Sequence, residues 1–232
     1  MPEPVSLRSS IGEILRWFRD RGIDPDAPIT DNDQPDRAED TRQAIAYADA
    51  HIPARYADAT ATDPAIADWV ERVAERANAD STGHIGVFAR RGPSILILGP
   101  TGVGKTHQAY GALRTLATLG VRAPWVAVSA ADLYARLRPR HGVDSETEFR
   151  SITDAPLLLV DDLGAAKTSE WVEEINYRLV NWRYERELPT VLTSNVPPKE
   201  LSAVLGERVA SRLVEMTDRI TLKGGDRRRA GV

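Results

Sequence analysis

Residues 99–106, GPTGVGKT, fit the pattern G-x-x-x-x-G-K-[S/T] between an apolar segment and a helical one. Glycines at this spacing let backbone N–H groups turn inward around a phosphate, and the start of the next helix adds positive potential. Lys105 would reach the β- and γ-phosphates, and the Thr106 hydroxyl would bind Mg²⁺. The alternative is a plain glycine-rich turn. The residues expected to contact bound ATP are Gly99, Pro100, Thr101, Gly102, Val103, Gly104, Lys105, Thr106 and His107.

A magnesium nucleotide site needs a second anchor, an acid at the end of a buried strand, and residues 157–164, LLLVDDLG, supply two. Asp161 would hold the metal through water, and Asp162 would accept a proton from the attacking water. In residues 191–195, VLTSN, the amide of Asn195 could orient that water without adding charge. The structural alternatives are a strand exit with solvated acids and an ordinary turn.

Two arginines lie late in the chain, in the helix predicted after Gly206. Arg208 and Arg212 are four residues apart and point away from the apolar stripe of Val209, Leu213 and Met216. An arginine delivered to the γ-phosphate is worth about 10³–10⁵ in rate. We expect at least one of them to reach the ATP of a neighbouring subunit. The alternative is local pairing, of Arg212 with Glu215 and of Arg208 with solvent.

The segments that must position these residues alternate between short apolar strands and helices. Strands are expected within residues 94–99, 123–129, 156–164, 188–195 and 218–224, and helices within 64–77, 105–120, 130–137 and from 169 onward. Asp63, Ser129, and either Thr168 or Ser169 would cap three of these helices. This alternation is typical of an α/β domain with a parallel sheet covered on both faces. We therefore expect a main domain over 51–232, after an amphipathic helix in 1–23 that either packs on the core or docks a partner, and an acidic linker over 24–50.

Composition excludes several classes of protein. The chain has 232 residues, a net charge of −4, no cysteine and four histidines, so disulfides and thiolate metal sites are excluded and a zinc site is not expected. No run of 18 apolar residues and no signal-peptide centre is present. These features predict a cytoplasmic protein without a membrane segment.

Residues 99–107, 157–195 and 205–216 together resemble the AAA+ ATPases of the DnaC type, which load replicative helicases onto DNA, and the related IstB-type proteins, which assist transposases. The resemblance covers roughly residues 52–228. It implies a P-loop NTPase of the AAA+ (ASCE) class, a three-layer sandwich with a five-stranded sheet in the order 5-1-4-3-2. It also places residues 52–56, IPARY, near the adenine pocket. In this family Lys105 and Thr106 belong to Walker A, Asp161 and Asp162 to Walker B, Asn195 to sensor 1, and Arg212 to the arginine finger with Arg208 as a second phosphate contact.

The resemblance predicts an ATP-dependent loader of a hexameric, DnaB-type replicative helicase that assembles into a ring, spiral or filament on single-stranded DNA. The alternatives are an IstB-type transposition helper and a stand-alone P-loop kinase. Cations that could track a DNA strand lie in residues 135–142, ARLRPRHG, with Tyr134 nearby. They are Arg136, Arg138 and Arg140; a solvated basic loop is the alternative. Arg227 or Arg228 could add a nucleotide contact, or belong to a frayed terminus.

Overall fold

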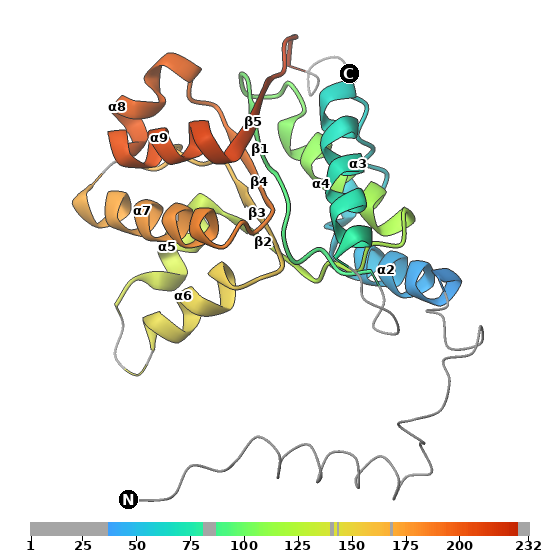
Figure 1. The fold of residues 1–232 in the computed structure, drawn as a ribbon. Coiled ribbons are helices and arrows are strands. Elements are labelled where there is room, and N and C mark those ends of the chain that lie inside the picture. Colours follow the sequence, from blue (N-terminus) through green and yellow to red (C-terminus); the bar gives the residue numbers. More distant parts are fainter. Residues whose placement is uncertain (1–36, 81–86, 140–141, 143, 168, 227–232) are drawn as a thin grey trace, which may run out of the picture. The chain divides into compact units, whose positions relative to one another are not determined.

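The computed structural model describes residues 37–80, 87–139, 142, 144–167 and 169–226 (Figure 1). Before the first strand come α2 (Arg37–His51), η2 (Ala54–Tyr56) and α3 (Pro64–Ala79). The central part contains β1 (Ser94–Leu98), α4 (Lys105–Thr118), β2 (Trp125–Ser129), α5 (Ala130–Leu137), α6 (Ser145–Thr153) and β3 (Leu157–Asp161). It continues with α7 (Glu170–Glu185), β4 (Thr190–Ser194), η3 (Pro198–Glu200), α8 (Leu201–Leu205), α9 (Glu207–Met216) and β5 (Thr217–Thr221).

The strands form one parallel sheet in the order β2-β3-β4-β1-β5. Read from its other edge, this is the order 5-1-4-3-2, so the predicted fold class and topology are confirmed. The carboxyl ends of all five strands meet at one edge of the sheet because the strands are parallel. The phosphate loop after β1, the acid pair at the end of β3 and Asn195 after β4 are thereby brought to the same edge.

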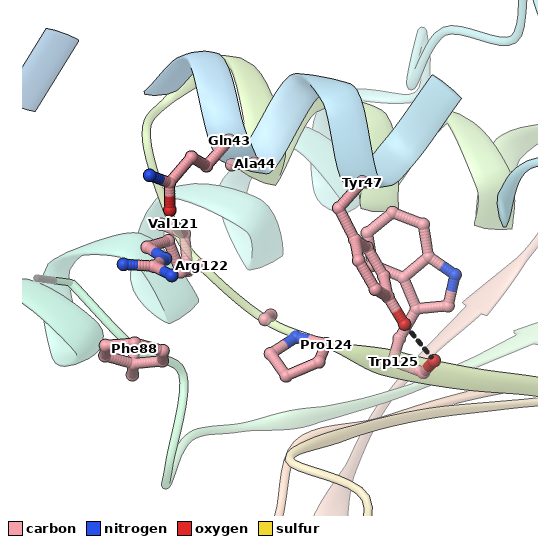
Figure 2. A pocket seen from close by; sticks show the side chains of 9 residues that line it. Gln43, Ala44, Tyr47, Phe88, Val121, Arg122, Pro124 and Trp125 are labelled. Atoms are coloured by element: carbon pink, nitrogen blue, oxygen red, sulfur yellow. Dashed lines mark hydrogen bonds between the residues drawn. The ribbon is translucent and has the colours of Figure 1, made fainter. Parts of the chain in front are cut away.

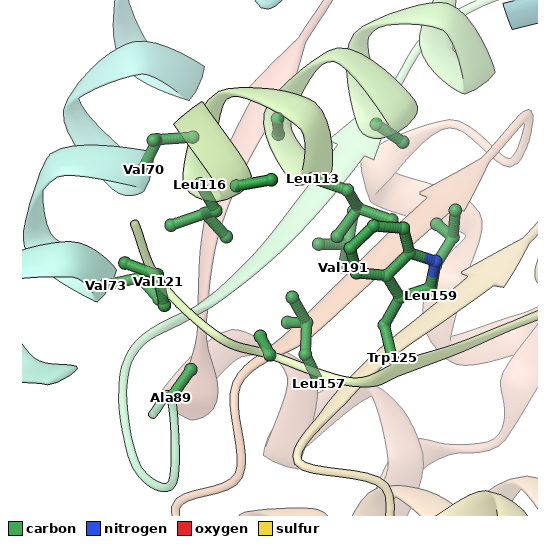
Figure 3. Packing of buried hydrophobic residues seen from close by; sticks show 14 of the residues in the cluster. Val70, Val73, Ala89, Leu113, Leu116, Val121, Trp125, Leu157, Leu159 and Val191 are labelled. Carbon is green, nitrogen blue, oxygen red and sulfur yellow. The ribbon is translucent and has the colours of Figure 1, made fainter. Parts of the chain in front are cut away.

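Successive apolar side chains of the central strands β1, β3 and β4 enter different cores, one on each face of the sheet. The first core lies under α2, α3 and α4 and is shown in Figure 3; its strand residues include Ile95, Ile97, Leu157, Leu159 and Val191. The second lies under α5 to α9, on the other face in Figure 1; its strand residues include Leu96, Leu98, Leu158, Val160 and Leu192. Burial of both faces explains why the central strands are apolar runs rather than alternating patterns.

Three helix starts confirm predicted caps. The Asp63 side chain accepts from the N–H of Ala65, with Pro64 at the first helical position of α3. The Ser129 hydroxyl accepts from the N–H of Asp132 at the start of α5, and Ser169 caps α7. Each side chain satisfies an N–H that has no partner inside its helix.

The predicted linker over 24–50 is wrong for residues 37–50, which belong to α2. Ala44 and Ala48 of this helix are buried in the first core, and Asp40 is buried in its first turn, where a carboxylate also favours the helix dipole. The buried face of α2 consists of small residues. Among the surrounding charged residues they give only a weak apolar pattern, so the sequence did not indicate a helix. The amphipathic helix predicted in 1–23 and residues 24–36 lie outside the described residues.

The helix predicted after Gly206 is α9. Val209 and Leu213 are buried in the second core and Met216 packs against it half-buried, as the spacing indicated. Helix α6 was not predicted; the Asp144 side chain caps its start. None of the helices in the described part of the chain has the length and hydropathy needed to cross a bilayer.

A buried arginine on α7 joins this helix to the amino ends of the neighbouring strands. Arg183 has no exposed surface, and burial lowers its pKa to about 9, so its guanidinium remains charged at neutral pH. The guanidinium donates to the Thr190 hydroxyl at 2.6 Å and to the Pro189 carbonyl at 2.6 Å. It also donates to the carbonyls of Thr153 and Ala155, at 2.9 and 2.8 Å. The charge thus has four hydrogen-bond acceptors, and buried charges require such partners.

We predict that Arg183→Leu lowers the free energy of unfolding by about 3 kcal/mol, because it leaves several buried acceptors without a donor. The measurement is urea denaturation of the full chain. Arg186→Leu is the matched control, since Arg186 is exposed at the C-cap of the same helix and stacks on Trp182. Arg186→Leu should lower the free energy of unfolding by less than about 1 kcal/mol. Equal losses in the two variants would show that the buried hydrogen bonds of Arg183 add nothing.

Candidate nucleotide-binding site

The loop between β1 and α4 has a backbone that only glycine tolerates at two positions. Gly104, the N-cap of α4, has φ 103°. Gly99 has φ 149°, and a Cβ there would lie 2.7 Å from the carbonyl oxygen of Leu222. These conformations are unfavourable for other residues. They shape a turn that ends at the amino terminus of α4, where backbone N–H groups favour an anion.

The ammonium of Lys105 links this loop to the tip of β4. Its side chain is buried, and Nζ donates to the carbonyls of Gly99 and Pro100 at 2.9 and 3.0 Å. Nζ also donates to Oδ1 of Asn195 at 2.5 Å. The predicted Lys105 and Asn195 are therefore in direct contact. Phosphate oxygens would have to replace these partners.

Asp161 ends β3 inside a group of hydroxyls. It accepts from the Thr106 hydroxyl at 3.0 and 3.1 Å to its two oxygens, and from the Thr193 hydroxyl at 2.5 Å. Burial raises the pKa of Asp161, and the charge of the adjacent Asp162 adds to this rise. The charged form of this carboxylate is costly to bury, and a bound cation beside it and the Thr106 hydroxyl would stabilise that form.

Asp162 turns away from Asp161 because its backbone is left-handed, with φ 55°. Its Oδ1 accepts from Nδ2 of Asn195 at 3.0 Å. Its N–H donates to the Thr193 hydroxyl at 2.9 Å. Thr193 was missed at the sequence level, although it lies in the quoted VLTSN segment. Its hydroxyl donates to one acid and accepts from the backbone of the next.

A cavity of about 560 Å³ lies over the loop, within the roughly 300–1,000 Å³ typical of small-molecule sites. The predicted residues that line it are Thr101, Gly102, Gly104, Lys105, Thr106, His107, Asp162 and Asn195. Gly99, Pro100, Val103 and Asp161 are not among the lining residues; Val103 is buried below the loop. Among the described residues, Nδ1 of His107 is buried without a hydrogen-bond partner. A ligand in the cavity could supply that partner.

The other wall of the cavity comes from η2 and the turn after it, with Arg55, Tyr56 and Asp58. The Tyr56 ring stacks on Tyr110 of α4, with centroids 4.9 Å apart. The family resemblance noted from the sequence placed residues 52–56 near the adenine pocket but did not indicate Tyr110 or Asp58. Only the fold shows that this segment faces the phosphate loop.

These residues fit ATP and Mg²⁺ by the chemistry of their donors. The loop offers N–H groups, a buried ammonium and a helix terminus to a triphosphate, and the rings of Tyr56 and Tyr110 stand beside the cavity. Within the described residues, no group of three or more His, Cys, Asp or Glu side chains could hold a metal ion. That suits Mg²⁺, which usually binds through one or two carboxylates together with phosphates and water. Thr106 and Asp161 would be its protein contacts.

The late arginines lie elsewhere. Neither Arg208 nor Arg212 lines the phosphate-loop cavity. Arg212 donates from Nε to Oδ1 of Asn181 on α7 at 2.7 Å, and its guanidinium lies 5.0 Å from the ring centroid of Tyr177. Arg208 is exposed and lines a separate groove between α7 and α9, whose other charged residues are Glu170, Glu173, Glu174 and Glu207. Glu215, the alternative partner for Arg212, is hydrogen-bonded to Tyr184 and raises its pKa.

The candidate DNA contacts are only partly described. Arg136 and Arg138 are exposed at the end of α5, whereas Arg140 lies outside the described residues. The candidate nucleotide contacts Arg227 and Arg228 also lie outside them. Tyr134 is not available to stack on a base: it is buried, and its hydroxyl donates to Asn176 at 2.7 Å. The spacing that placed Tyr134 near the arginines also placed it on the core face of α5.

The fold and this site define a P-loop ATP-binding protein of the AAA+ class. The chain belongs to the family of IstB-like ATP binding proteins (IstB_IS21), whose model matches residues 83–228. It is similar to the IS21 insertion-sequence ATP-binding protein of Pseudomonas aeruginosa, with 25% identity over 62% of this chain and 58% of that protein. It is also similar to the replicative helicase loader DnaC of Escherichia coli, with 25% identity over 52% of this chain and 49% of that protein.

Solved structures share the fold. The crystal structure of the DnaC helicase loader has a TM-score of 0.57 at 24% identity and covers 74% of this chain and all of that one. The crystal structure of DnaI has a TM-score of 0.58 at 22% identity, covering 75% and 95%. At these identities the similarity shows the fold alone. The chain spans less than two thirds of the two relatives compared above by sequence.

We predict that Tyr56→Ala weakens ATP binding about three- to tenfold, because an aromatic wall of the cavity is lost. Isothermal titration would also measure inorganic tripolyphosphate, whose affinity should not change. Tyr56→Phe keeps the ring and should bind ATP like the unaltered protein. Parallel weakening of ATP and tripolyphosphate would place Tyr56 beside the phosphates instead of the base.

Proposed function

We propose that this protein hydrolyses ATP in an assembly in which each site is completed by the next subunit, and that it loads a replicative DNA helicase of the DnaB type onto single-stranded DNA. The observation that carries this proposal is the separation of two functional groups. Lys105, Asp162 and Asn195 meet in one cavity, whereas Arg208 and Arg212 lie on α9 outside it.

The residues of the cavity suit phosphoryl transfer to water. Lys105 would exchange its carbonyl partners for phosphate oxygens, and Thr106 and Asp161 would hold Mg²⁺, which neutralises charge on the phosphates. Asp162 would accept a proton from the attacking water. Asn195 already donates to Asp162, so its amide can orient a water molecule next to that carboxylate.

The missing component is a cation for the charge that builds up on the γ-phosphate. Within the described residues, Lys105 and Arg55 are the cations that line the cavity, and Arg55 adjoins Tyr56 in η2. Arg212 is held by Asn181 and the Tyr177 ring, near the surface between α7 and α9. A subunit that docks this surface against the cavity of its neighbour would supply the guanidinium. Turnover would then require assembly.

We predict that the rate of ATP hydrolysis per subunit rises steeply with protein concentration, and that Arg212→Ala loses turnover while it retains ATP binding. The expected loss is about 10³-fold or more. Mixing Arg212→Ala with Lys105→Ala protein should restore part of the activity, because an interface between the two variants contains one intact site. Steady-state phosphate release measures turnover in each case, and isothermal titration measures the ATP binding of Arg212→Ala.

The control for this experiment is Arg114→Ala, which removes an arginine of α4 that faces Asp49 at 3.8 Å and should leave turnover unchanged. Absence of rescue in the mixture would contradict a site shared between subunits. Turnover that stays flat on dilution and rises with a small-molecule acceptor would instead favour a P-loop kinase.

A second candidate function, assistance of a transposase, is favoured by the family to which the chain belongs and by its similarity to insertion-sequence proteins. The DnaC similarity favours the loader. The two functions differ in the DNA expected: single strands for a loader and duplex for a filament-forming transposition helper.

We predict that single-stranded DNA binds the ATP-bound protein more tightly than duplex DNA of equal length. Changing Arg136 and Arg138 to glutamine should reduce the salt dependence of this binding, by about 0.7 in log K against log salt for each lost phosphate contact. Fluorescence anisotropy at several salt concentrations measures both. Changing the exposed Arg90 and Arg91 to glutamine is the matched control. A preference for duplex would support the transposition helper.

A further inference from the structure

A second cavity, of about 250 Å³, lies between α2 and the segment that leads into β2 (Figure 2). Tyr47 and Trp125 form one end, where their rings meet edge to face and the Tyr47 hydroxyl donates to the Trp125 carbonyl at 3.1 Å. Phe88 and Arg122 lie at the other end in Figure 2. None of the residues that line this cavity lines the phosphate-loop cavity.

The size of the cavity indicates what it can hold. It is smaller than the roughly 300–1,000 Å³ of pockets that enclose cofactor-sized ligands. Single bulky side chains that bury themselves in well-packed pockets are the usual anchors of protein–protein interfaces. Apart from Arg122 and Gln43, the lining is apolar or aromatic: Ala44, Tyr47, Phe88, Val121, Ala123, Pro124 and Trp125. One apolar side chain of another protein fits this space and chemistry.

Arg122 gives the cavity a charge. Its guanidinium lies 5.0 Å from the ring centroid of Phe88, and its Nη1 is 3.3 Å from Oδ1 of Asp40. A guanidinium carries several N–H donors in a planar fork, and Arg122 uses the one on Nη1 to reach Asp40, while its charge also acts on Glu39. The Arg122 side chain is 35% exposed, against 10% for Asp40. A carboxylate of another protein can therefore approach the guanidinium, because Asp40, which would repel it, is more deeply buried.

We propose that this cavity binds a segment of a partner protein that presents a bulky apolar side chain next to a carboxylate. The side chain fills the space between Tyr47, Phe88 and Trp125, and the carboxylate pairs with Arg122. This site goes beyond the proposed function and requires neither ATP hydrolysis nor DNA, so it can fail or succeed independently of them.

The test uses the ¹⁵N-labelled full chain and the synthetic peptide acetyl-Asp-Leu-Trp-Asp-amide. Its comparison peptide has Asn in place of both Asp residues. The indole N–H signal of Trp125, assigned with Trp125→Phe, reports on the cavity directly. We expect a saturable shift of this signal with the acidic peptide, and at least threefold weaker binding of the Asn peptide because one charge-assisted contact is lost.

Two variants and a matched control complete the test. Arg122→Gln should weaken the acidic peptide at least threefold and leave the Asn peptide unchanged. Gln43→Glu, on the exposed side of α2, should weaken the acidic peptide by placing a second carboxylate beside Arg122. Arg114→Gln removes an arginine of similar exposure (37%) that also faces a carboxylate of α2, Asp49, and should have no effect. Retained ATP binding shows that each variant is folded.

Three results would overturn the proposal: no shift of the Trp125 signal at millimolar peptide, equal affinity of the two peptides, or equal effects of Arg122→Gln and Arg114→Gln. Broadening of the Trp125 signal with protein concentration alone would assign the cavity to a second copy of this chain. That outcome also contradicts a partner of different sequence.

Discussion

The nucleotide site depends on a continuous set of hydrogen bonds along the edge of the sheet. Lys105 donates to Asn195, and Asn195 donates to Asp162. The Thr193 hydroxyl then connects the backbone of Asp162 to Asp161, which also accepts from Thr106. Each polar group that ends an apolar strand would be costly to bury alone, and each finds its partner on a neighbouring strand. A triphosphate that binds Lys105 would therefore replace hydrogen bonds that already exist.

Strand β4 is held at both ends by a buried cation. At its carboxyl end the ammonium of Lys105 meets Asn195, and at its amino end the guanidinium of Arg183 meets Thr190. Apolar side chains of the strand fill the cores on either face between these points. A strand at the centre of a sheet is a rigid support. The rigidity places the amide of Asn195 beside Asp162 without help from a flexible loop.

The surfaces of the molecule divide into separate regions. The phosphate-loop cavity lies at the carboxyl ends of the strands, the arginines of α9 border a groove against α7, and the aromatic cavity lies under α2. In the proposed assembly, these separate regions would let one chain bind nucleotide, a neighbouring copy and another protein at the same time. ATP would control the first two contacts, whereas the cavity at α2 shares no lining residue with the nucleotide site.

The sequence by itself determined the phosphate loop, the apolar strands, the helix caps and the acid pair, because these depend on local spacing and backbone preference. The sheet order came from the family resemblance, and pairing of the strands confirmed it. Only the tertiary structure decided that residues 37–50 form a helix, since alanines that bury a small face leave little apolar signal among charges. It also decided that Tyr134 belongs to the core, that Thr193 joins the two acids, and that Arg212 rests on α7. These contacts join residues distant in the chain, and no local pattern specifies them before the strands and helices have packed.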